Sequence, residues 1–152
     1  MAFISENIES EGYITGDTLT ANTITAGIVS ATTVSVLNLI NSGTLKINGI
    51  LTPTQITEHV NNYNPTGLSS ANVLRLSSDG PKQISGIIAQ ESGVEIRIIN
   101  VGLSNITIVN SSALSDVENR FDIGLNLIIN LSTSCTIWYD ITSARWRIIS
   151  HY

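Results

Sequence analysis

Residues 18–37 read TLTAN-TITAG-IVSAT-TVSVL, four consecutive blocks of five residues. An α-helix returns a side chain to the same face after about 3.6 residues and a flat strand after 2, so a period of five predicts short extended pieces separated by turns. The aliphatic residues that recur at this period are Ile14, Leu19, Ile24, Val29, Val34 and Leu39.

This aliphatic row needs a second surface to pack against, because so thin a segment cannot bury it alone. Three intertwined copies would turn their rows toward a common axis and leave Thr, Ser and Asn outside. We therefore expect a homotrimer with the row in its interface. The alternative is a single-chain pentapeptide-repeat helix, which favours a small residue two positions before each central aliphatic residue. Those positions hold Asp17, Asn22, Gly27 and Thr32, so the match is partial.

Composition and charge exclude several classes of protein. Charged residues make up 12% of the chain, against about 25% in an average soluble protein, and the abundance of β-branched residues favours strands. The formal net charge of −5 offers no basic field for nucleic acid. The uncharged run at residues 123–139 is interrupted by Asn and Ser residues, so we expect no membrane insertion.

A turn and a short helix are predicted between the repeat and the rest of the chain. Asn48-Gly49 stands between two apolar stretches, which is a strong hairpin signal. Thr52 as N-cap, followed by Pro53 and Gln55, predicts a helix over residues 53–62. The sequence Asn64-Pro65-Thr66-Gly67 would end this helix and act as a hinge.

The predicted helix has one apolar face, with Ile56, Val60 and Tyr63 at positions i, i+4 and i+7. So short a helix is marginal by itself, but three copies around the trimer axis would form a collar and add these residues to the trimer interface. We expect no metal site. The one candidate ligand is His59, which three copies would place around the axis, although a solvated or partly packed histidine is the ordinary interpretation.

From residue 71 onward, short stretches of alternating apolar and polar residues are separated by turn signals, which predicts an antiparallel β-sandwich of the jelly-roll kind. The whole chain is thus expected to be all-β, with a repetitive β stalk at 1–51, a helix and hinge at 52–70 and a β head at 71–152. The expected strands of the head are Val73–Ser77, Gln83–Ala89, Val94–Asn100, Asn105–Asn110, Glu118–Phe121, Leu125–Leu131, Cys135–Tyr139 and Arg145–Ile149.

Residues suited to catalysis are scarce. The two histidines, His59 and His151, belong to no recognisable catalytic motif, and no standard metal-ligand spacing occurs. Cys135 alternates with apolar residues and has no basic neighbour to activate it, so we interpret it as a core residue. We expect a protein that is not an enzyme and holds no cofactor.

One charged cluster near the carboxyl end is a candidate recognition surface. Asp140 precedes the last predicted strand, and Arg145 and Arg147 flank Trp146 within it. Bidentate arginine contacts and aromatic stacking are what recognition of sugars and carboxylates uses. Alternation places the two arginines on one face of the strand and Trp146 on the other, so we expect Trp146 and Trp138 in the core and salt bridges between subunits at the arginines.

Several short motifs resemble parts of bacteriophage surface proteins. The Thr-Ile-Thr-Ala-Gly style of repeat resembles the shafts of phage fibres, and residues 55–67 are similar to a connector of phage fibre and neck proteins. The motifs that look like the carboxyl-terminal β heads of such proteins are Ser85-Gly86-Ile87, Ile99-Asn100-Val101-Gly102, Glu118-Asn119-Arg120-Phe121, Trp138-Tyr139-Asp140 and Ser143-Ala144-Arg145-Trp146-Arg147.

This resemblance implies a trimeric, non-catalytic component of the virion surface. The leading hypothesis is a short fibre whose stalk binds tail or baseplate proteins and whose head attaches to a glycan or protein of the host surface. The alternative is a capsid decoration protein, of the cement or head-fibre type, that binds the major capsid protein and stabilises the shell. A carbohydrate-active enzyme is the third hypothesis, and the poverty of catalytic groups argues against it.

Overall fold

The computed structural model describes residues 49–152, which fold around one apolar core. The aliphatic row from Ile14 to Leu39 and the first half of the predicted hairpin lie outside these residues. Within them the structure is mostly β, with no α-helix and two short 3-10 turns, η1 (Leu68–Ser70) and η2 (Val117–Asn119).

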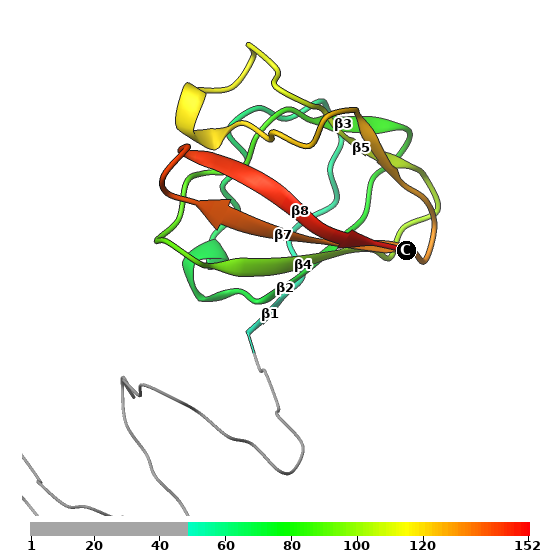
Figure 1. The fold of residues 1–152 in the computed structure, drawn as a ribbon. Helices are drawn as coiled ribbons and strands as arrows, with labels where there is room; N and C mark the ends of the chain where they lie inside the picture. The colour runs from blue at the N-terminus through cyan, green and yellow to red at the C-terminus, as the bar shows by residue number, and fades with distance from the viewer. Residues whose placement is uncertain (1–48) are drawn as a thin grey trace, which may run out of the picture. The chain divides into compact units, whose positions relative to one another are not determined.

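The strands form two sheets that face each other across the core (Figure 1). The large sheet has the order β1-β2-β4-β7-β8, and the small sheet has the order β3-β5-β6. The strands of the large sheet are β1 (Ile50–Leu51), β2 (Val73–Leu76), β4 (Glu95–Asn100), β7 (Ser134–Asp140) and β8 (Arg145–His151). Those of the small sheet are β3 (Lys82–Ile84), β5 (Ile106–Ile108) and β6 (Leu127–Ile129).

The first part of the described chain winds from one sheet to the other in parallel turns. β1, β2 and β4 pair in parallel, and so do β3 and β5. Val73 pairs with Arg97 and Lys82 with Ile106, so in both sheets the partners are 24 residues apart (73 to 97 and 82 to 106). Each winding therefore contributes one segment to each sheet, and successive windings stack edge to edge.

The predicted helix over residues 53–62 is wrong. This segment is extended and lies parallel to the chain around β3, through bridges Ile56–Ser78, Val60–Ile84 and Tyr63–Ile87. The Val60 amide donates to the Gln83 carbonyl at 2.9 Å. An isolated ten-residue helix is barely stable, whereas the extended form supplies the first winding of the small-sheet side and buries Ile56, with Val60 and Tyr63 packed against the same core.

The second part of the described chain reverses direction and makes both sheets mixed. β6 is antiparallel to β5, β7 to β4 and β8 to β7. The expectation of two facing sheets is confirmed, and the expectation that they are antiparallel throughout is wrong. Alternation of apolar and polar residues is the same in parallel and antiparallel strands, so it cannot distinguish them. Parallel neighbours need crossover connections of a dozen or more residues, which the long loops of this chain provide.

Seven of the eight expected strands overlap an observed strand. The exception is Glu118–Phe121, where the chain forms η2 and then touches three other segments through single bridges, Gly86–Arg120, Asn110–Phe121 and Phe121–Trp146. This stretch closes the end of the core rather than adding a strand to either sheet.

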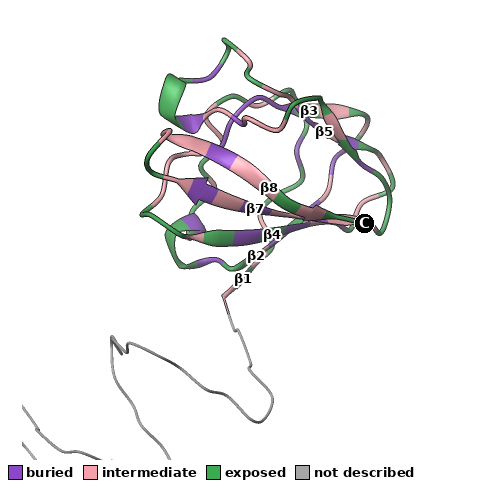
Figure 2. Cartoon of the chain, in the orientation of Figure 1, coloured by how far each residue is buried: buried purple, intermediate pink, exposed green. Residues whose placement is uncertain are grey.

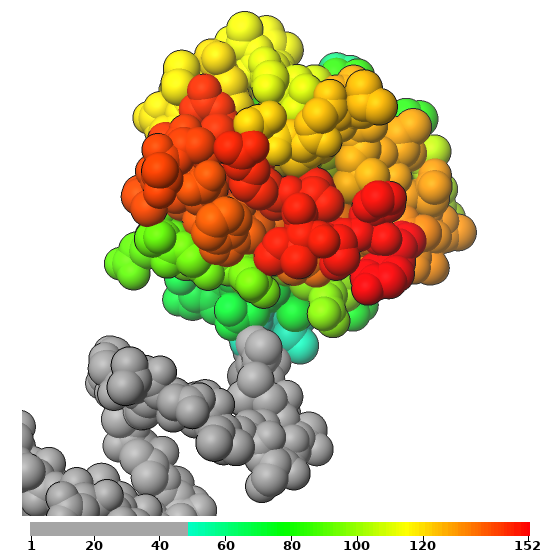
Figure 3. Space-filling view, in the orientation of Figure 1, coloured from blue at the N-terminus to red at the C-terminus, as the bar shows by residue number. Residues whose placement is uncertain are grey.

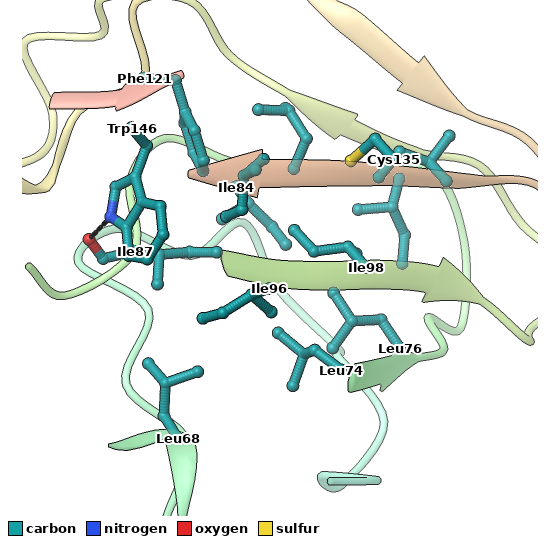
Figure 4. Close-up of a cluster of buried hydrophobic side chains, with 14 of the residues drawn as sticks. Leu68, Leu74, Leu76, Ile84, Ile87, Ile96, Ile98, Phe121, Cys135 and Trp146 are labelled. Carbon is teal, nitrogen blue, oxygen red and sulfur yellow. Dashed lines mark hydrogen bonds between the residues drawn. The ribbon is translucent and has the colours of Figure 1, made fainter. Parts of the chain in front are cut away.

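Inward-facing side chains are almost all apolar, and buried positions alternate with more exposed ones along β4 and β7 (Figure 2). Trp146 is fully buried, as expected, and its indole Nε1 donates to the Ile87 carbonyl at 2.8 Å (Figure 4). Tyr139 meets the Trp146 ring edge to face, with centroids 5.1 Å apart. The indole hydrogen bond joins the large sheet to the loop that follows β3, whereas the ring contact lies within the large sheet.

Gly86 lies where three segments meet. A Cβ atom at this position would come within 2.6 Å of both the Asn119 carbonyl oxygen and the Ser115 hydroxyl. Because the carbonyl belongs to the backbone, it cannot move aside as a flexible side chain would.

We therefore predict that Gly86→Ala lowers the free energy of unfolding by about 1–3 kcal/mol, as over-packing of a tight core does. Gly80→Ala is the matched control, since nothing lies within 4 Å of its added Cβ. Denaturant unfolding followed by circular dichroism measures both variants. Equal midpoints for the two would contradict the close approach.

Candidate functional site

The outer face of the large sheet carries most of the chain's arginines. Arg75 is flanked by the buried Leu74 and Leu76, and Arg97 by the buried Ile96 and Ile98, so alternation turns both arginines outward. Trp146 separates Arg145 and Arg147 in the same way on β8. Four of the five arginines of the sequence thus share one face: Arg75, Arg97, Arg145 and Arg147.

The strand register sets the neighbours of these arginines. One row across the face runs from Glu95 through Trp138 to Arg147. Trp138 is half-buried on the outer face, contrary to the expectation that it lies in the core. A Cβ added to Gly93 would lie 3.9 Å from its indole Nε1, so Gly93 lies beside the indole nitrogen.

Two of the three residues expected to form a recognition cluster contact each other. Arg147 forms ion pairs with Asp122 and, at 3.5 Å, with Asp140. Asp140 also accepts hydrogen bonds from the Ser143 hydroxyl at 2.7 Å and from the Thr142 amide at 3.1 Å. The Ser143 hydroxyl is the main cause that lowers the pKa of the Asp140 carboxyl below its ordinary value.

Arg145 makes a different set of contacts. Its Nη1 donates to the Val117 carbonyl at 2.6 Å and to the Ala144 carbonyl at 2.8 Å, which ties η2 to the β7–β8 turn. Arg145, Arg147 and Asp140 therefore bond to groups of their own chain and hold the turn and the 120–122 segment together.

Arg75 and Arg97 are the residues that the sequence analysis missed. They lie on adjacent parallel strands, where Arg97 pairs with Val73 and Arg75 with Ile99, so the two are diagonal neighbours. Both are exposed, and neither forms an ion pair with another residue of the described range. The signal was the repeated pattern of one arginine between two aliphatic residues, Leu74-Arg75-Leu76 and Ile96-Arg97-Ile98.

His59 is exposed and lies in the extended segment rather than in a helix. Its Nδ1 accepts a hydrogen bond from the Gln83 amide at 3.1 Å, so that nitrogen is already engaged. Within residues 49–152, no three His, Cys, Asp or Glu side chains converge as metal ligands would.

A shallow hollow of about 130 Å³ lies between β6 and the carboxyl end of β8. In the space-filling view the C-terminal residues (red) lie at the surface beside the segment around residue 130 (orange; Figure 3). The side chains that line it belong to Leu127, Ile128, Ile129, Asn130, Thr133, Ser134, His151 and Tyr152. Among the residues of the described range that line it, none has a carboxylate or thiol side chain.

A polar cluster stands beside the core and joins three loops. The Asn119 side chain is buried; its Oδ1 accepts from the Ala89 amide at 2.8 Å and its Nδ2 donates to Asn62 Oδ1 at 2.9 Å. The hydroxyls of Ser85 and Ser115 lie 2.6 Å apart, and the Asn62 amide donates to Ser115 Oγ at 3.0 Å. The cluster fastens the 111–120 loop to the first winding.

Cys135 is buried in β7 with only 1% of its surface exposed, which confirms the expectation that it is a core residue. Burial raises the pKa of its thiol from 9.0 to about 12. The thiolate is the reactive form of cysteine, so the folded protein keeps Cys135 unreactive.

No family model, no curated protein sequence and no solved structure matches this chain. No helix in the described part of the chain is long and apolar enough to cross a membrane.

We predict that Asn119→Ala lowers the free energy of unfolding by about 1–3 kcal/mol, because it leaves the partly buried Ala89 amide without its acceptor. Asn105→Ala, which removes an exposed asparagine, is the control and should have little effect. Thermal unfolding compares the two. A similar small change in both would mean that the polar cluster does not hold the loop.

We predict that a thiol reagent modifies Cys135 only when the protein is unfolded. Stability should also fall as the pH rises from 9.0 toward about 12, because the unfolded thiol releases its proton near 9.0 while the folded thiol still retains it. Cys135→Ala should remove this part of the pH dependence in denaturant titrations. Rapid labelling of the native protein would contradict the buried, protonated thiol.

Proposed function

We propose that this chain is a non-enzymatic structural protein of the bacteriophage surface, a short trimeric fibre anchored through its N-terminal repeat. Residues 49–152 would be the head that it presents to the host surface. The observation that carries the proposal is where the two ends of the described chain lie in the large sheet. The described chain begins at β1, one edge of this sheet, and ends at β8, the opposite edge.

Chain ends at opposite edges of the sheet suit a head that is anchored at one of them. The described chain enters the head at β1, so an anchor at that edge would leave β8 at the opposite edge accessible. Recognition residues are commonly carried on loops and exposed surfaces that a rigid scaffold positions. The parallel windings and their apolar core supply such a scaffold.

The β1 edge also supports assembly with other chain segments. Within residues 49–152 no strand pairs with the outer side of β1, and Ile50 is 63% exposed there. Open ends of stacked windings and unpaired edge strands normally need cover. The N-terminal repeat, with its aliphatic residue at every fifth position, has the same need for a partner, and intertwining of three copies would satisfy both.

We expect the full chain to be a trimer in solution, with three times the 16.3 kDa mass of one chain by light scattering. Replacing Ile24 and Val29 with Asn should reduce this mass, because it places polar groups in the aliphatic row. Replacing Thr23 and Thr25 with Asn, at polar positions of the same repeat, should leave it unchanged. A monomeric parent protein would overturn the trimer.

Location on the particle tests the attachment role. Gold-labelled antibodies against the head should decorate the tail region of intact virions, and the same antibodies should block adsorption to host cells. Label spread over the capsid would point to the decoration role instead. If removal of the protein also left adsorption normal and lowered shell stability, the attachment proposal would be overturned.

A further inference from the structure

We infer that the outer face of the large sheet binds an acidic polysaccharide. Arg75 and Arg97 would contact its carboxylate groups, and Trp138 would stack against a sugar ring. The inference rests on the proposed attachment function and names the class of ligand that the head would recognise.

The charge on this face is opposite to that of the chain as a whole. The chain has a formal net charge of −5, yet the face carries four arginines against the carboxylates of Glu95 and Asp140. Arg147 and Arg145 are engaged by their own chain. Arg75 and Arg97 are thus the two guanidinium groups of this face that remain for a ligand.

The placement of these two arginines suits a shared ligand. They stand diagonally on adjacent parallel strands rather than directly opposite each other, and long side chains at diagonal positions remain within reach of one ligand. Because guanidinium groups bind carboxylates through two parallel hydrogen bonds, two such groups at a fixed separation suit a ligand with spaced carboxylates.

The side chains around the arginines favour a saccharide over other polyanions. Trp138 lies on the outer face next to Arg147 and Glu95 and is partly exposed, and a sugar ring can stack on such an indole. The hydroxyls of Thr136 and Ser150 lie in the same row as Arg97 and can pair with sugar hydroxyls. A nucleic acid carries far denser charge, about one per 1.7 Å of duplex, than two arginines can neutralise.

The backbone under this face is held rigidly. β2 and β4 are joined by a parallel ladder, β4 and β7 by an antiparallel one, and the opposite side of each strand is buried in the core. The Cα atoms of Arg75, Arg97 and Trp138 therefore keep their spacing without a ligand. A preformed site loses less entropy on binding than a mobile loop.

The experiment measures binding of the full chain to immobilised polygalacturonate, a carboxylated polysaccharide. The parent protein should bind it, should not bind neutral dextran, and should release it as salt shortens the screening length from about 10 Å at 0.1 M to about 3 Å at 1 M. Arg75→Gln and Arg97→Gln should each weaken binding by about tenfold. Arg97→Lys, which keeps the charge but loses the planar fork, should lie in between.

Lys82→Gln is the matched control, because it removes the same charge from the small sheet. It should bind as the parent does. Trp138→Leu should lose affinity for polygalacturonate while keeping the parent's weaker affinity for polyglutamate, an acidic chain without sugar rings. Equal binding of the two polymers by the parent protein would overturn the proposal that the ligand is a saccharide. Arginine variants that bind polygalacturonate as the parent does would also overturn it.

The inference would be overturned if the parent bound no polysaccharide and Arg75→Gln or Arg97→Gln lost the trimer. That result would mean that the face is a contact between copies. Failure of this inference can be distinguished from failure of the proposed function. If the protein acts as a virion fibre in adsorption but does not bind acidic polysaccharide, only the proposed ligand is wrong. If the chain binds polysaccharide but is absent from particles, only the proposed virion role is wrong.

Discussion

The parallel ladder between successive windings is the interaction on which the rest of this structure depends. Each winding is too short to enclose a core, so the segments at 50–63, 73–87 and 95–108 are stable only because each one satisfies the backbone hydrogen bonds of the next. The chain then reverses, and the last winding is paired by β6 along β5 and by β7 along β4. Core packing, the tight approach at Gly86 and the polar cluster around Asn119 all follow from that stacking.

The same ladder explains why a polar cluster can stand beside an apolar core. Asn62 belongs to the first winding, Ser85 to the second and Asn119 to the stretch after the third. Their side chains meet because stacking brings positions about one winding apart into contact. Buried polar groups are tolerated when each has a partner, and here each loop supplies the partner that another lacks.

Strand positions could be predicted from the sequence because alternation acts over a few residues, as at Leu74-Arg75-Leu76. Strand direction could not, since a parallel and an antiparallel neighbour demand the same pattern of burial. The segment from Pro53 to Asn62 carries good helix-start residues, but the hydrogen bonds from Val60 and Tyr63 to distant residues outweigh that local preference. The candidate site was half predicted: Arg147 and Asp140 meet as their nearness in the chain suggested, whereas Arg75 and Arg97 meet only through the parallel register.

The 24-residue winding has a consequence for how such a head could change its length. Inserting or deleting one whole winding would add or remove one strand in each sheet, a step of about 4.8 Å, and would leave the remaining register and the β7–β8 closure intact. Each added winding would also offer further outward positions beside Arg75 and Arg97. Descendants of this chain could thus extend their binding face one strand at a time, by duplication, without redesigning the core.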